Sequence, residues 1–134
     1  MFNTHVKGQI AELKVQLRAV EKGMVISKPI PEARYDLVLD DGTELLRAQV
    51  KYVDSSSKNS QGAVMLHLGK KTAGKTRVYQ ENDFDILLAY LPRVDKIVRL
   101  PVEMVAGKRS ITIRLEPVQN GQTKNVLFFE NFIW

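Results

Sequence analysis

The sequence of 134 residues contains no cysteine and no long apolar run. The absence of cysteine excludes disulfide bridges, zinc ribbons and thiol nucleophiles, and it fits a reducing compartment. No run of about 18 apolar residues could span a membrane, and the stretch MFNTHVKGQIAELK lacks the apolar core of a signal peptide. We therefore expect an intracellular, cytoplasmic protein without a membrane partner.

Several familiar catalytic patterns are missing as well. The sequence shows no Ser-His-Asp arrangement, no glycine-rich phosphate loop and no cluster of His and Cys ligands. The two histidines, His5 and His67, are isolated, and such residues are usually exposed or hydrogen-bonded rather than catalytic. The sequence therefore gives no indication of these three kinds of catalytic or binding site.

The length and the hydrophobic content of 44% predict one compact domain, residues 1–134, with an adequate core. No internal repeat, low-complexity segment or linker divides the chain. A helix is expected from about Val6 to Glu21, capped by Asn3 or Thr4 and ended by Gly23. Its predicted buried face has helical spacing and contains Val6, Ile10, Leu13, Leu17 and Val20. A second row along the edge of that face contains His5, Gln9, Glu12 and Gln16.

The remaining chain has the pattern of strands. Residues 35–40 and 44–53 predict a hairpin, because the Asp-Gly pair at 41–42 between them is a strong turn signal. The apolar run at 84–91 predicts a buried central strand. Other expected strands are residues 24–30, 63–70, 96–101, 109–117 and 125–130. The pattern predicts a mixed α/β (α+β) fold, with the N-terminal helix packed against a largely antiparallel sheet.

Polar residues on the second and third predicted strands share one face. Asp36 alternates with apolar residues on its strand, and Gln49 and Lys51 do so on theirs. If the two strands pair, these three side chains converge. Carboxylate and amide oxygens are ligands that Mg²⁺ accepts, and the lysine would lie near a water that the metal polarises. The arrangement predicts metal-assisted hydrolysis of a phosphodiester.

Asp36 followed by the sequence QVK at 49–51 resembles the PD-(D/E)XK nuclease superfamily, which has the restriction-endonuclease-like fold. Glutamine stands where that superfamily has an acid, and a neutral amide attracts a dication less strongly. The longer segments 8–51 and 77–101 resemble the group I intron-associated PD-(D/E)XK homing endonucleases. In that family, active enzymes can have glutamine at the position of Gln49.

The resemblance implies a role for each residue. Asp36 would be the central metal ligand and Gln49 a second one, while Lys51 would orient or help to deprotonate the attacking water. Glu12 matches the acid on the family's first helix and would support the metal, directly or indirectly. The implied cofactor is Mg²⁺, for which Mn²⁺ can substitute. Taken singly, each residue has an ordinary surface interpretation, so the prediction rests on their joint spacing.

The net charge of +5 is concentrated in one segment. Between Lys51 and Arg77 six cations accompany a single acid, Asp54, which indicates a polyanionic partner, here double-stranded DNA. A basic loop at 70–76 is expected to form a flexible arm. Candidate DNA-binding residues are Lys58, Asn59, Gln61, Lys70, Lys71, Lys75, Arg77, Arg109 and Arg114.

The sequence thus predicts a site-specific, Mg²⁺-dependent DNA endonuclease. One such site cuts one strand, so a homodimer is expected, and the family resemblance also allows a homotetramer. The C-terminal Phe132, Ile133 and Trp134 could be core or could contact another subunit. The alternatives are a Holliday-junction resolvase of the same fold, a catalytically inactive DNA-binding module, and an RNA-binding or structural protein.

Overall fold

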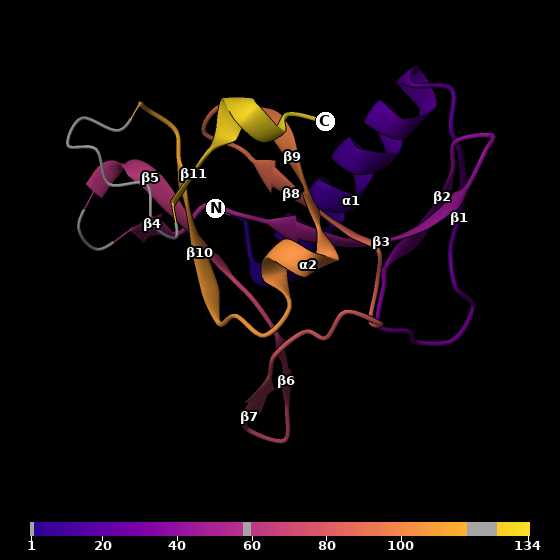
Figure 1. Ribbon diagram of the computed structural model, residues 1–134, viewed down its shortest axis with the longest axis horizontal. Coiled ribbons are helices and arrows are strands. Elements are labelled where there is room, and N and C mark those ends of the chain that lie inside the picture. Colours follow the sequence, from indigo (N-terminus) through magenta and orange to yellow (C-terminus); the bar gives the residue numbers. More distant parts are fainter. Residues whose placement is uncertain (1, 58–59, 118–125) are drawn as a thin grey trace.

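The structure is a computed structural model, and it describes residues 2–57, 60–117 and 126–134. In these ranges one long helix packs on one face of a five-stranded mixed sheet, and a second sheet covers part of the other face (Figure 1). The predicted fold class is therefore confirmed. None of the helices in the described part of the chain has the length and apolarity needed to cross a membrane.

The helix α1 (Thr4–Glu21) ends where the sequence predicts and begins two residues before the predicted Val6. The side chain of Asn3 caps its start by accepting a hydrogen bond from the backbone N–H of Val6 at 2.9 Å. After its last turn, Gly23 takes a φ of 78°, a conformation that costs glycine little.

The buried face of α1, however, differs from the prediction. The residues that pack on the sheet are Ala11, Val15 and Ala19, each at most 1% exposed. Of the predicted face, Val6 and Ile10 are half-buried, whereas Leu13, Leu17 and Val20 are 64%, 59% and 62% exposed. Small side chains let the helix approach the sheet closely, so the spacing of the larger apolar residues indicated the wrong face.

The five-stranded sheet has the order β1-β2-β3-β8-β9. Its strands are β1 (Val25–Ser27), β2 (Leu37–Asp40), β3 (Leu45–Tyr52), β8 (Ile86–Leu91) and β9 (Lys96–Pro101). Neighbouring strands are antiparallel except for β3 and β8, which are parallel. The predicted hairpin is confirmed: β2 pairs with β3, with Leu39 opposite Leu46 and Gly42 in the turn at a φ of 93°.

Strand β8 is buried along its whole length, as predicted for a central strand. Its side chains alternate between two cores, and the core beneath α1 receives Ile86, Leu88 and Tyr90. The other face of β8 packs against the second sheet. A strand that is apolar on both faces needs a covering layer on each side, and here α1 covers one face and the second sheet covers the other.

The second sheet has the order β11-β10-β5-β4. Its strands are β4 (Ser56–Ser57), β5 (Ser60–His67), β10 (Ser110–Arg114) and β11 (Val126–Phe128). Strand β10 runs antiparallel to β5 and parallel to β11. The described part of the chain also has two short helical segments, α2 (Val102–Val105) and η1 (Phe129–Phe132).

The C-terminus folds back onto the first sheet. Trp134 is 7% exposed and belongs to the core beneath α1, and its N–H donates to the carbonyl of Ile97 at 2.9 Å. Ile133 is 46% exposed. The sequence left open whether Trp134 is a core residue or contacts another subunit. In the structure it is a core residue of its own chain.

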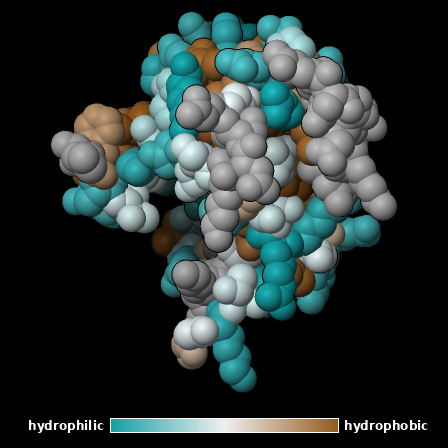
Figure 2. Space-filling model, turned by 90° about the vertical axis from the view of Figure 1, so that its left-hand side faces the viewer, coloured by the Kyte–Doolittle hydropathy of each residue, from teal (hydrophilic) through white to brown (hydrophobic). Residues whose placement is uncertain are grey.

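The basic segment at 70–77 forms a hairpin of its own, where the sequence predicted a loop. Strand β6 (Lys70–Thr72) pairs with β7 (Lys75–Arg77), and both turn residues, Ala73 and Gly74, have positive φ angles of 51° and 77°. The hairpin projects from the body at the bottom of Figure 1, and Figure 2 shows residues of intermediate hydropathy on this projection, with a hydrophilic side chain at its tip.

Candidate active site

A cavity of about 600 Å³ opens beside β2 and β3, on the face of the sheet opposite α1. It contains all three residues predicted from the strand pattern, Asp36, Gln49 and Lys51. Their placement follows from alternation, because Ala48 and Val50 between them are buried beneath α1 and the polar side chains must face the other way. The structure therefore brings the predicted residues together.

Asp36 lies directly before β2, where its backbone and side chain both bind β3. Its N–H donates to the carbonyl of Ala48 at 2.9 Å, and its Oδ2 accepts from the N–H of Val50 at 2.8 Å. These two bonds fix the carboxylate relative to the strand that carries Gln49 and Lys51. One oxygen of the carboxylate is thus used structurally, at the edge of the cavity.

The electrostatic environment of Asp36 opposes its ionisation. Burial raises the pKa of its carboxyl above the ordinary value, and the negative charge of Glu12 raises it further. The hydrogen bond from Val50 and the cations Lys51 and Lys28 lower the pKa but do not reverse the shift. A positive charge bound nearby would therefore stabilise the ionised form of this carboxylate.

Glu12 reaches this region from α1. Its carboxylate forms an ion pair with Lys28 at 3.4 Å, and Lys28 lines the cavity although Glu12 itself does not. Its effect on the pKa of Asp36 places it close enough to act on the site electrostatically. The structure thus places Glu12 beside a residue that lines the cavity, and its role at a metal ion stays a prediction.

The donor groups fit a hard divalent cation. The negative charge of Glu12 raises the pKa of the Asp36 carboxyl, so the two carboxylates repel each other, and Gln49, whose amide carries an oxygen, lines the same cavity. Mg²⁺ accepts such oxygens and takes its remaining ligands from waters and substrate phosphate. Among the described residues, no group of three or more His, Cys, Asp or Glu side chains could hold a metal, so any ion here would depend on Gln49 and on oxygens from outside the chain.

Lys51 is positioned by a residue that the sequence did not single out. Its Nζ lies 5.5 Å from the centre of the Tyr79 ring, over the ring face. Tyr79 is 5% exposed and packs edge-on against Phe84 with ring centres 5.0 Å apart. Tyr79 belongs to no strand and follows no periodic pattern, so only the folded structure reveals its contact with Lys51.

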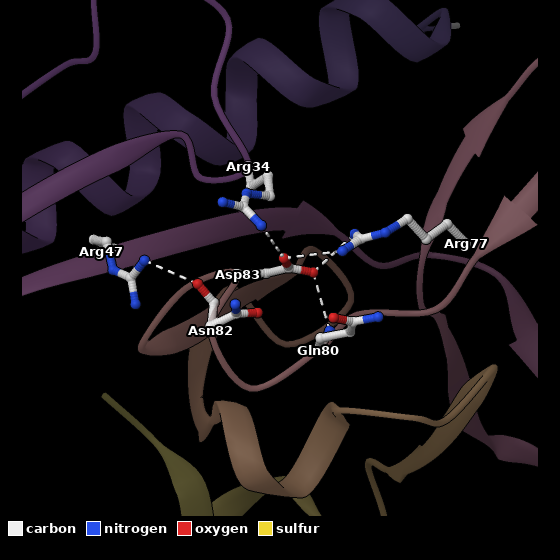
Figure 3. A network of polar contacts seen from close by, with 6 residues as sticks. All are labelled: Arg34, Arg47, Arg77, Gln80, Asn82 and Asp83. Carbon is white, nitrogen blue, oxygen red and sulfur yellow. Dashed lines mark hydrogen bonds and ion pairs between the residues drawn. The ribbon is translucent and has the colours of Figure 1, made fainter.

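A second group that sequence reasoning missed lies at the side of the cavity. The carboxylate of Asp83, with a fully buried side chain, binds Arg77 from the basic hairpin and Arg34 from the loop before β2 (Figure 3). Hydrogen bonds from Arg77 hold the pKa of Asp83 below its ordinary value. The sequence indicated only a short helical turn here, and residues 81–83 do form a turn.

Those predicted DNA-binding residues whose side chains the structure describes do not form a single cluster. Arg77 lines the cavity, and Lys75 is exposed on the same hairpin. Arg109 lines a separate cavity of about 380 Å³, and Arg114 is a half-buried strand residue that donates to the carbonyl of Glu116. Lys58 and Asn59 lie outside the described residues, and of Lys70, Lys71 and Gln61 only the strand positions are described.

The environment of Asp36 leads to a first prediction, on stability. An acid whose pKa is higher in the folded protein than in the unfolded chain stabilises the fold at low pH, and that stability is lost as pH rises through the raised pKa. Asp36→Asn removes the ionisation and keeps an oxygen for the N–H of Val50. In EDTA at neutral pH, thermal unfolding of Asp36→Asn should therefore occur at a higher temperature than that of the wild type. Below about pH 3.9, the ordinary Asp value, the difference should disappear. A variant that is no more stable at neutral pH would contradict this account.

Comparison with known proteins agrees with this geometry. A family model described as PD-(D/E)XK endonuclease matches residues 2–134. Among solved structures, the chain is similar to a bacterial homing endonuclease, I-Ssp6803I, with a TM-score of 0.77 and 28% sequence identity over 98% of this chain and 89% of that chain. No curated protein matches the chain. Both similarities span the region from Glu12 to Lys51.

Proposed function

The chain belongs to the PD-(D/E)XK endonuclease family, and on this premise we propose that it hydrolyses phosphodiester bonds in duplex DNA with a divalent metal ion. The predicted family resemblance and the restriction-endonuclease-like fold are confirmed. The observation that carries the proposal is the convergence of Asp36, Gln49 and Lys51 in one cavity. Similarity to a homing endonuclease supports cleavage at specific sites.

In this proposal the protein supplies oxygen ligands for a metal ion and a lysine that acts on the reacting groups. The carboxylate of Asp36 and the amide oxygen of Gln49 would hold Mg²⁺ or Mn²⁺, and Glu12 would add negative charge behind them. When bound, the ion supplies a water of lowered pKa and neutralises charge on the phosphate. Lys51, held over the ring of Tyr79, would donate to the attacking water or to a phosphate oxygen as negative charge develops there.

The direct test is cleavage of a library of randomised DNA duplexes by the purified wild type. We expect cleavage of a subset of sequences with Mg²⁺ or Mn²⁺ and none with EDTA, because the water needs the metal to become nucleophilic at neutral pH. One site cuts one strand, so a homodimer or homotetramer should cut both strands of a selected duplex in one encounter. Accumulation of duplex nicked in one strand only would contradict that assembly.

The other outcomes of this experiment separate the alternatives. Preferential cleavage of a four-way junction over linear duplex would indicate a resolvase of the same fold. DNA binding without cleavage, with either ion, would indicate an inactive DNA-binding module and would overturn the proposed activity. RNA binding without preference for DNA would also contradict it.

A further inference from the structure

Asp83 is an unusual residue in this structure. Among the described residues it is the one charged residue that is buried, at 1% exposed. Its carboxylate accepts from Nη1 and Nη2 of Arg77 at 2.9 and 3.2 Å, from Nη1 of Arg34 at 3.1 Å, and from the N–H of Gln80 at 3.0 Å. Figure 3 shows the two guanidinium groups approaching this one carboxylate from different elements. A buried acid with several charge-assisted bonds is held in one position.

The two arginines meet at the cavity although they are distant in sequence. Arg34 lies in the loop before β2, and Arg77 is the last residue of β7. Both line the cavity that holds Asp36 and Lys51, and their side chains are 59% and 44% exposed. Each guanidinium therefore contacts Asp83 while much of its surface remains accessible from the cavity side.

The charges of this cluster favour an anion. Two guanidinium groups share a single carboxylate, so one positive charge remains uncompensated within the cluster. Guanidinium groups bind phosphate through paired N–H donors, and Asp83 keeps two of them side by side despite their mutual repulsion. The DNA backbone next to a bond being cut presents phosphates at regular intervals along the strand.

The turn that carries Asp83 is itself bound to β3, the strand that carries Gln49 and Lys51. Arg47 on β3 donates to the carbonyl of Asn82 at 3.0 Å, and its backbone N–H donates to the carboxylate of Asp85 at 2.7 Å. At the base of the hairpin, a Cβ on Gly69 would lie 2.6 Å from the carbonyl oxygen of Arg77, so only glycine permits this approach. The hairpin, the turn and β3 are thus linked as one unit.

We propose that Arg34 and Arg77 clamp a DNA backbone phosphate beside the one that is cleaved, and that Asp83 is the positioning residue that holds both over the cavity. The inference rests on the proposed nuclease function and adds to it a substrate subsite. It assigns a role to Arg34 and Asp83, neither of which the sequence indicated, and gives Arg77 a defined partner.

The test measures binding separately from cleavage. Arg34→Met and Arg77→Met remove the charge and keep the length of the side chain. In a salt titration in EDTA with a fluorescently labelled duplex of mixed sequence, each should weaken binding roughly tenfold and lower the slope of log K against log salt by about 1. Lys96→Met, on the edge strand β9, serves as the matched control and should keep the wild-type slope. Wild-type slopes in both arginine variants would overturn the clamp.

Asp83→Asn tests positioning. It keeps the shape of the side chain and removes the charge that orders the arginines. Below its unfolding temperature, Asp83→Asn should raise the half-saturating DNA concentration and lower the slope of log K against log salt. If only the unfolding temperature changes, Asp83 is purely structural and the positioning role is overturned. If Asp83→Asn does not fold, the exposed arginine variants still decide the clamp. The binding assay needs no catalysis, so a wild type that binds but does not cut would contradict the proposed function without affecting the clamp result.

Discussion

Replacing Lys51 by alanine is expected to slow DNA cleavage by roughly 10²–10⁴-fold, the range typical of losing a positioned acid-base or charge-stabilising group. Lys51 is the cation that β3 directs into the cavity beside Gln49, and Tyr79 fixes its ammonium over the ring face. Asp36→Asn should reduce cleavage at least as far, because it removes the charged oxygen ligand from the same site.

Single-turnover cleavage at saturating DNA and Mg²⁺ is the appropriate measurement, since it separates chemistry from binding. Matched controls are available on the same sheet. Asp40→Asn, on β2, matches Asp36→Asn, and Lys96→Ala, on β9, matches Lys51→Ala. Neither Asp40 nor Lys96 lines the cavity. Both controls should cleave like the wild type. Near-wild-type rates in Lys51→Ala and Asp36→Asn would show that the chemistry lies elsewhere.

The two predictions for Asp36 reinforce each other. Asp36→Asn should lose activity while gaining stability in EDTA at neutral pH, because the ionised carboxylate is unfavourable in the metal-free fold. Loss of activity through general unfolding would have the opposite effect on stability. Opposite changes in the two measurements would therefore identify Asp36 as a group kept for function at a cost in stability.

The parts of the site that the sequence predicted depend on local rules. The Asp-Gly turn at 41–42 sets the register of β2 and β3, and alternation along β3 directs Gln49 and Lys51 to one face. Both signals act within a few residues, so they can be recognised without the fold. The family resemblance carried the rest of the assignment, including Glu12.

The parts that the sequence did not predict depend on contacts between distant segments. The ion pair of Arg34 with Asp83 joins residues 49 positions apart. Nothing in the local pattern around Asp83 distinguishes its buried carboxylate from an exposed one, and nothing around Arg34 marks it as the partner. The buried face of α1 was predicted wrongly for a related reason: close packing against the sheet selected alanines, whose weak apolar signal was outweighed by Leu13 and Leu17.

The second large effect is expected for the core beneath the site. Phe84→Ala should lower the free energy of unfolding by about 3–5 kcal/mol, the usual cost of removing a buried phenylalanine. Phe84 is fully buried and supports Tyr79, which in turn contacts Lys51. A typical domain is stable by only about 5–15 kcal/mol, so this loss is a large fraction of the total.

Urea unfolding monitored by circular dichroism measures this change, with Glu81→Ala as a control at an exposed position of the same turn. The control should differ from the wild type by less than about 0.5 kcal/mol. Phe84 lies between Asp83 and Asp85, whose carboxylates bind arginines from the loop before β2, from β7 and from β3. The ring therefore anchors a turn on which the arginine pair and the lysine both depend. If Phe84→Ala changed stability by less than about 1 kcal/mol, the turn would have to be held by its ion pairs alone, which partly exposed pairs rarely achieve.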